Sequence, residues 1–178
     1  MSSSTSPSYT RVAVLLHWLV ALLIVINFAV GLSMEHFEGT PTRDQILFYH
    51  ASFGSLVFIL VILRLSWRIT HRPPALPASV ARWQVIAADV MHGLLYVLML
   101  AVPLTGYLHR VAGGHPVSFF GLGTLPLLVD KNMSLRLLMG SVHTTLVWVL
   151  AFLVLGHVAA ALKHHFIDRD GVLGRMWR

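Results

Sequence analysis

The sequence predicts an all-α integral membrane protein, a bundle of four transmembrane helices with both termini in the cytoplasm. Its 178 residues are 56% hydrophobic and only 11% charged, whereas about a quarter of the residues of a soluble domain are charged. Four apolar segments are each long enough to cross a bilayer hydrocarbon core of about 30 Å. We expect the spans at residues 12–32, 46–67, 84–109 and 136–165.

The length leaves room for one membrane domain, which we expect at residues 11–167. A polar tail precedes it at residues 1–10, and a charged cytoplasmic tail follows at residues 168–178. The first tail has no basic segment and no small-residue cleavage site, so it does not read as a signal peptide. The chain contains no cysteine, which excludes disulfides, thioether-attached haem, iron–sulfur clusters and thiolate catalysis.

The net charge of +6 follows from a bias of Lys and Arg toward one side of the predicted membrane. Nine lie on one side and four on the other, so the positive-inside rule places both termini in the cytoplasm of a multi-pass protein of the bacterial inner membrane. We therefore interpret the charge as a sign of membrane topology and expect no nucleic-acid partner. The larger group is Arg11, Arg64, Arg68, Arg72, Arg82, Lys163, Arg169, Arg175 and Arg178, and the smaller is Arg43, Arg110, Lys131 and Arg136.

The first two spans each carry a histidine near their start. The first span has no charged residue and contains His17, and the second begins just before His50. A short turn-rich loop containing Pro41 joins them. Three prolines at positions 73, 74 and 77 then predict an extended linker.

The last two spans are separated by the longest loop, residues 110–135. The third span contains Asp89 and His92 in its first part. The loop is apolar and rich in glycine, so we expect it at the membrane surface or as a re-entrant segment. The fourth span carries His143 and His157.

The histidines of the fourth span organise the interpretation. They are fourteen positions apart, which returns them to within about 40° of the same helix face. They are separated by roughly 21 Å along the helix axis. One imidazole therefore lies near each edge of the hydrocarbon core.

Depth in the membrane pairs each of these histidines with one on another span. His17 and His157 lie near the inner edge, and His50 and His143 lie near the outer edge. Two axial imidazoles from facing helices bind one haem b, so the pattern predicts two haem b groups. A single polar residue in a span is usually a helix–helix hydrogen bonder, which stays the alternative for each histidine alone. Gly31 and Gly106 would leave room for a flat cofactor, or serve ordinary helix packing.

Other side chains have supporting roles in this interpretation. Arg64 lies fourteen positions after His50 and would contact a propionate of the inner haem, whereas we expect Arg68 to anchor at lipid headgroups. His92 could compete with His17, and His109 with His50; we assign His92 to contacts around the ligands. Lys163, His164 and His165 would donate hydrogen bonds to a quinone headgroup at the inner surface, or alternatively meet anionic lipid.

The chain resembles the bacterial cytochrome b561 family, the four-helix di-haem group that includes the superoxide oxidase. The resemblance covers nearly the whole chain after residue 10, and its final stretch is the most specific. It implies axial ligation by His17, His50, His143 and His157 and a cytoplasmic quinone site near His164 and His165. The stretches that carry it are RVAVLLHWLV, YHASFG, VILRLSWRIT, AVPLTGYL, HPVSFFGL and GHVAAALKHHFIDRDGVLGRM.

The resemblance also implies an oxidoreductase that oxidises superoxide at the periplasmic face and reduces ubiquinone. A net positive patch of Arg110, Lys131 and Arg136 would steer the superoxide anion, unless these residues serve only as interface anchors. The alternative is a conduit that oxidises quinol and passes electrons to a periplasmic partner protein or subunit. The sequence assigns no catalytic side chain, and the absence of repeats argues against a haem-free transporter.

Overall fold

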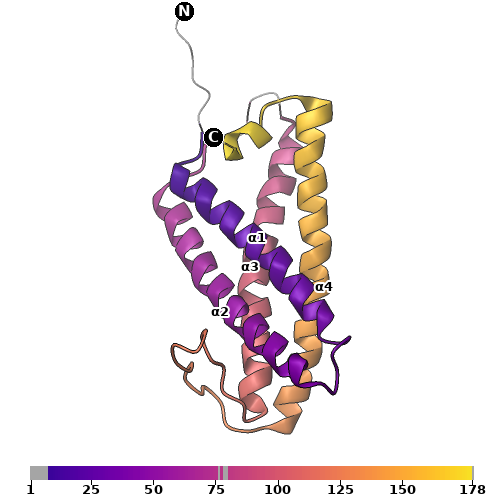
Figure 1. Cartoon of the computed structure of the whole chain (residues 1–178). Coiled ribbons are helices and arrows are strands. Elements are labelled where there is room, and N and C mark those ends of the chain that lie inside the picture. Colours follow the sequence, from indigo (N-terminus) through magenta and orange to yellow (C-terminus); the bar gives the residue numbers. More distant parts are fainter. Residues whose placement is uncertain (1–7, 76, 78–79, 178) are drawn as a thin grey trace, which may run out of the picture.

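Four long helices account for most of the computed structural model, which describes residues 8–75, 77 and 80–177 (Figure 1). They are α1 (Arg11–Ser33), α2 (Pro41–Thr70), α3 (Arg82–Ala112) and α4 (Met133–Lys163). A π-helical turn, η1 (His164–Asp168), extends α4, and a short 3-10 helix, η2 (Leu173–Met176), follows. Most of the predicted N-terminal tail, residues 1–7, and Arg178 lie outside the described residues.

All four helices are long and apolar enough to cross a membrane, which confirms the prediction of an all-helical protein with four such helices. The helices begin one to five residues before the predicted spans, because polar and proline residues outside the apolar stretch start the helix. Thr10 caps α1 by accepting a hydrogen bond from the Ala13 N–H (3.3 Å), and Asn132 caps α4 through the Leu135 N–H (2.9 Å). Pro41 occupies the first position of α2, where its missing N–H costs nothing.

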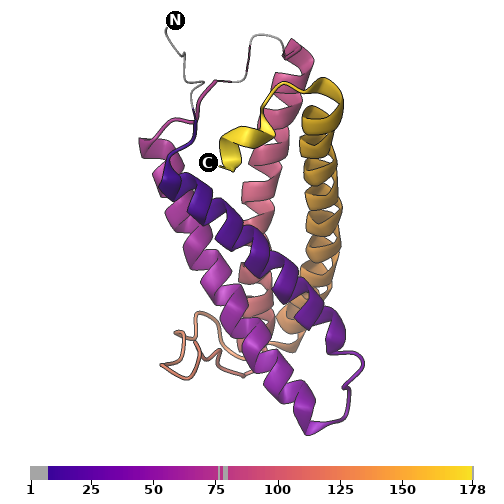
Figure 2. The same cartoon turned by 45° about the horizontal axis from the view of Figure 1, so that its top comes forward.

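The helices pack as α1 against α2, α2 against α3, and α3 against α4. Figure 2 shows α1 and α2 side by side, both running obliquely in front of α3 and α4. The common core is small and aliphatic, and Val61 at its centre is fully buried. Much of the apolar surface faces outward, as Phe152 with 75% of its area exposed illustrates, because lipid rather than protein covers it.

The loop after α3 is fastened to α2. Ser52, which is fully buried, donates to the Ser118 carbonyl (3.1 Å) and accepts from the Phe120 N–H (3.1 Å). Phe120 has a positive φ of 50° and packs edge-on against Phe53 with ring centres 5.2 Å apart. The loop therefore covers the end of the bundle two residues from His50.

The start of α1 and the C-terminal η2 lie at the same end of the bundle, the upper end in Figure 1. The indole N–H of Trp18 donates to the Met176 carbonyl (2.8 Å), and Arg175 donates to the Ala75 carbonyl (2.6 Å). The C-terminal segment is thus tied to α1 and to the linker after α2. We refer to this end as the inner end, after the predicted cytoplasmic side.

Replacing Ser52 with alanine tests how the loop is held. The Ser52→Ala change leaves the Phe120 N–H and the Ser118 carbonyl without their partner, at about 1–3 kcal/mol per buried unpaired group. We expect faster proteolytic cleavage within residues 113–132 and a lower unfolding temperature. Ser55→Ala is the matched control, because the Ser55 hydroxyl contacts only the Ala51 carbonyl of its own helix. Equal cleavage rates in the two variants would contradict this role of Ser52.

Candidate functional site

Four half-buried histidines form two pairs at different depths in the bundle. His17 of α1 faces His157 of α4 with ring centres 6.3 Å apart, and His50 of α2 faces His143 of α4 at 6.2 Å. These are the same pairs that the predicted depths of the histidines in the membrane indicate. Helix α4 contributes to both, while α1 and α2 enter from opposite ends and contribute to one each.

We call the pair near the loop after α3 the outer pair. Hydrogen bonds fix which ring nitrogen carries the proton in both of its histidines. Nδ1 of His50 lies 3.2 Å from the Asn27 carbonyl oxygen, and Nδ1 of His143 lies 2.9 Å from that of Val102. A carbonyl only accepts hydrogen bonds, so each Nδ1 carries the proton and donates it. The lone pair of each neutral ring is then at Nε2, which is the arrangement of a metal-binding histidine with an outer hydrogen bond.

Two glycines make room for the outer imidazoles. A Cβ atom on Gly31 would lie 3.0 Å from His50 Cε1, and a Cβ on Gly106 would lie 2.9 Å from His143 Cε1. In this structure the space that these glycines leave is occupied by histidine rings from the neighbouring helix.

The two histidines of α3 do not belong to these two cross-helix pairs. His92 is in the inner layer, with its ring centre 5.4 Å from that of His157. His109 donates from Nδ1 to the Arg136 carbonyl (2.8 Å), and its ring lies where a Cβ on Gly140 would be. His109 is therefore fixed against the start of α4.

Two arginines of α2 surround the inner pair. Nη2 of Arg64 donates to Nδ1 of His17 (2.9 Å). The guanidinium groups of Arg64 and Arg68 lie 5.4 Å and 5.9 Å from the centre of the Tyr96 ring, within cation–π range. Arg68, expected at the lipid headgroups, is instead half-buried beside the same ring as Arg64.

At the inner end of α4, two of the three predicted quinone-site residues are engaged with carboxylates. Lys163 Nζ lies 2.5 Å from Asp168 Oδ2, and His164 Nδ1 lies 2.5 Å from Asp170 Oδ2. Burial disfavours the charge on Asp170, but hydrogen bonds from the Val172 N–H and His164 outweigh it and hold the pKa of Asp170 below its ordinary value. His165 is exposed and packs edge-on against Phe166.

The three cations proposed to steer an anion come together at the outer end. A Cβ on Gly113 would lie 3.2 Å from Arg136 Cδ, and one on Gly114 would lie 3.4 Å from Lys131 Cδ. Both glycines follow Arg110 at the end of α3, and their N–H groups donate to the Arg110 and Val111 carbonyls. The structure thus gathers Arg110, Lys131 and Arg136 around one turn.

The comparisons with known proteins agree with this architecture. The model of the prokaryotic cytochrome b561 family matches residues 8–178. The chain belongs to this family. Like its relatives it is a multi-pass bacterial membrane protein that transfers electrons, and the family's cofactor is haem b.

Similar proteins cover almost the full chain. Cytochrome b561 homolog 2 of Escherichia coli is 33% identical over 99% of this chain and 95% of the relative. Cytochrome b561 homolog 1 of the same organism is 31% identical over 94% and 96%, respectively. The probable superoxide oxidase CybB of Yersinia pestis is 26% identical over 94% of each chain.

The geometry of the histidine pairs fits axial ligation of a metal. A metal–imidazole bond is about 2.0–2.1 Å long and the ring centre lies roughly 1.1 Å beyond the nitrogen, so two rings on opposite sides of one ion have centres about 6.3 Å apart. Both cross-helix pairs, at 6.3 Å and 6.2 Å, match this value. The separation of His92 from His157, 5.4 Å, is too short for it.

Sequence reasoning missed two groups that the structure places at the site. Tyr96 lies four positions after His92, so helical spacing alone predicts a shared face and was an available signal. The role of the Asn27 carbonyl could not be predicted from the sequence, because every residue has a backbone carbonyl that can accept a hydrogen bond. The Asn27 side chain adds a buried Oδ1 without a partner among the described residues.

Gly106→Ala tests the packing around His143. The added methyl group overlaps the imidazole, and such overpacking costs about 1–3 kcal/mol. We expect less bound haem per polypeptide in the absorption spectrum and a lower unfolding temperature. Gly93→Ala is the control, since nothing lies within 4 Å of its Cβ position, and alanine there should stabilise the helix by about 0.5–1 kcal/mol. Equal haem content in both variants would show that Gly106 provides no essential space.

Proposed function

We propose that this protein binds two haem b groups and moves electrons from superoxide at the periplasmic face to ubiquinone at the cytoplasmic face of the bacterial inner membrane. His17 and His157 are the proposed axial ligands of the inner haem, and His50 and His143 those of the outer one. The observation that carries the proposal is the presence of two histidine pairs with the ring separation of axial ligands.

When bound, haem b supplies one-electron redox chemistry at each pair. The carbonyl groups of Asn27 and Val102 orient the outer imidazoles and make them stronger donors through the Nδ1–H hydrogen bond. An electron would enter at the level of the outer pair and leave at the level of the inner pair. The histidines of α4 set the distance between these levels.

Arg64 would have to change its hydrogen-bond partner when a haem occupies the proposed inner site. It donates to Nδ1 of His17, and a neutral imidazole that accepts at Nδ1 carries its proton at Nε2. Coordination through Nε2 therefore requires Arg64 to leave Nδ1 for another acceptor. A haem propionate is the proposed acceptor, and His92 packs beside the ligand His157.

The three cations at the outer end favour an electron donor that carries a negative charge. Arg110, Lys131 and Arg136 would raise the local concentration of superoxide at the outer face. Two superoxide ions lose one electron each and become two O₂, and ubiquinone takes two electrons and two protons to become ubiquinol. One relative is named a probable superoxide oxidase, which favours this donor over a partner protein.

The inner end is the proposed side of quinone reduction, with protons taken from the cytoplasm. Lys163, His164 and His165 remain proposed neighbours of the quinone. Because Lys163 and His164 are engaged with carboxylates, proton supply suits them better than direct contact with the headgroup.

Single histidine replacements test the pairing. We expect His143→Ala and His157→Ala each to bind one haem instead of two, because each removes an axial ligand from one site only. A pyridine haemochrome assay counts the haems, and redox titration identifies which potential is lost. His109→Ala is the control and should retain both haems. Loss of both haems, or of neither, in the single ligand variants would refute the pairing.

Superoxide kinetics test the electron donor. The purified protein with oxidised haem and ubiquinone receives a steady supply of superoxide, and a bimolecular rate constant below about 10⁵ M⁻¹s⁻¹ would instead favour the quinol-oxidising conduit. Replacing Lys131 and Arg136 with glutamine should slow haem reduction several-fold at low salt, and the difference should shrink at high salt as screening increases. Arg72→Gln, on the segment at the opposite end, should leave the rate unchanged.

A further inference from the structure

Thr105 of α3 places a buried hydroxyl group beside the ring of His143. The residue is 9% exposed, and its Oγ1 lies 3.4 Å from Nδ1 of His143. The same oxygen lies 2.9 Å from the carbonyl oxygens of both Ala101 and Val102. The Val102 carbonyl is also the acceptor of the Nδ1–H of His143, at 2.9 Å. One turn of α3 thus brings a hydroxyl group and two carbonyl groups to a single imidazole edge.

The hydroxyl group has one proton and two carbonyl acceptors within reach, and His143 decides between them. The Val102 carbonyl already accepts from the imidazole, whereas the Ala101 carbonyl has no other side-chain donor in the described part of the chain. Ala101 lies four positions before Thr105, and the carbonyl at that position is an ordinary acceptor for a threonine within a helix. The proton therefore goes to Ala101, which leaves a lone pair of Oγ1 free to face the Nδ1–H of His143.

This arrangement gives the Nδ1–H of His143 two oxygen acceptors. The Val102 oxygen at 2.9 Å is the main one, and the Thr105 oxygen at 3.4 Å is the longer arm of a three-centre hydrogen bond. Both oxygens bring partial negative charge to the N–H, so the imidazole donates more strongly through Nε2. A stronger axial donor stabilises oxidised iron more than reduced iron, and hydrogen bonding around an axial ligand is one way in which a protein tunes a haem potential.

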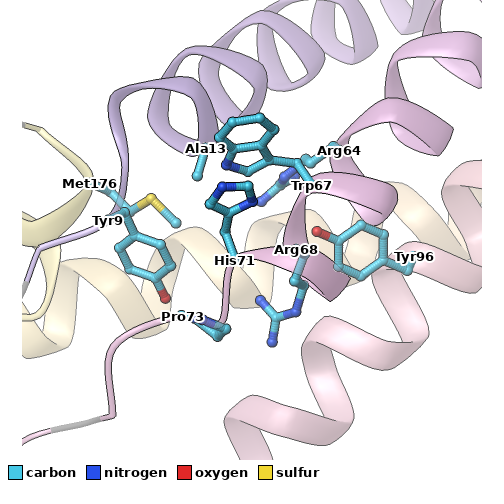
Figure 3. A pocket seen from close by; sticks show the side chains of 9 residues that line it. All are labelled: Tyr9, Ala13, Arg64, Trp67, Arg68, His71, Pro73, Tyr96 and Met176. Atoms are coloured by element: carbon cyan, nitrogen blue, oxygen red, sulfur yellow. The ribbon is translucent and has the colours of Figure 1, made fainter.

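The effect of Thr105 is confined to the outer pair. Among the residues that the structure describes, no other proposed ligand has a hydroxyl group at its Nδ1. Nδ1 of His50 meets a single backbone carbonyl, at 3.2 Å. Nδ1 of His17 faces the cationic Arg64 at 2.9 Å, one wall of a pocket at the inner end of the bundle (Figure 3). A change at Thr105 should therefore alter the outer site and leave the inner site as it is.

Satisfying a hydroxyl group inside a membrane does not by itself explain this position. Thr145 of α4 donates to the carbonyl of Ser141, four positions before it, at 2.9 Å, and it does so from an exposed site. Thr105 is instead buried against the imidazole, next to Gly106, whose missing side chain leaves the space that the ring of His143 occupies. The two neighbouring positions thus have complementary roles, since one makes room for the ring and the other contacts its N–H.

We propose that Thr105 is a positioning residue that acts through His143 and lowers the reduction potential of the outer haem. The inference rests on the proposed binding of a haem between His50 and His143, and it adds a residue that does not touch the iron. A lower outer potential favours the inward step, in which one electron leaves the outer site, which is oxidised, and enters the inner site, which is reduced.

The test is an anaerobic redox titration of the full-length, haem-loaded protein, followed by optical and electron paramagnetic resonance spectra. Thr105→Val keeps the shape of the side chain and removes the hydroxyl group. We expect the ratio of reduced to oxidised outer haem at a fixed potential to rise several-fold, the ferric signal of that haem to shift, and the inner haem to stay unchanged. Thr105→Ser should restore the wild-type values. Thr145→Val, the same change at a hydroxyl group away from the ligands, should alter neither haem.

The potential that is lost in His143→Ala identifies the outer haem. An unchanged or lower outer potential in Thr105→Val, or an equal shift of both haems, overturns the inference. If the valine variant loses the outer haem, Thr105→Ala and Thr105→Ser are compared instead. A higher outer potential in the alanine variant supports the role of the hydroxyl group, and equal potentials refute it. A wild-type protein with fewer than two haems refutes the proposed function, whereas two haems that do not respond to Thr105 refute only this inference.

Discussion

An imidazole inside a membrane needs a partner, and this requirement governs the arrangement of the bundle. Lipid offers no hydrogen bonds, so each half-buried ring must find a carbonyl, another side chain or a metal. Helix α4 brings two such rings to different depths, and α1 and α2 meet them there with one ring each. The glycines beside the outer rings, Gly31 and Gly106, leave the space that this pairing needs.

The parts of the site that follow from helical periodicity and membrane depth were predictable from the sequence. The presence of four helices able to span a membrane is confirmed, and the fourteen-residue spacing indicated pairs that the structure brings together. Features that depend on tertiary contacts were not predictable. The carbonyl partners of His50 and His143, the fastening of the third loop by Ser52 and the inward position of Arg68 are decided by how helices meet. The helices also start before the predicted spans, because caps such as Asn132 lie outside the apolar pattern.

The two ends of the bundle differ in chemistry although the two histidine pairs have nearly the same ring separation. Outside, cations gather around the last turn of α3, near a loop that the Ser52 hydroxyl fastens to α2. Inside, arginines and aromatic rings surround an open pocket. Membership of the cytochrome b561 family accounts for electron transfer by the shared centre. The residues at these two ends decide which partners an individual family member reacts with, and they can differ between relatives that share the same fold.

In the proposed two-haem arrangement, helix α4 would also fix the distance for electron transfer. His143 and His157 lie on one unbroken helix, so their axial separation of roughly 21 Å is set by backbone hydrogen bonds. Tilting of α1 or α2, or a change in bilayer thickness, alters neither the number of turns between them nor their common face. Tunnelling rates depend steeply on distance, so in the proposed two-haem arrangement a spacing built into a single helix would keep the transmembrane step constant in membranes of different composition.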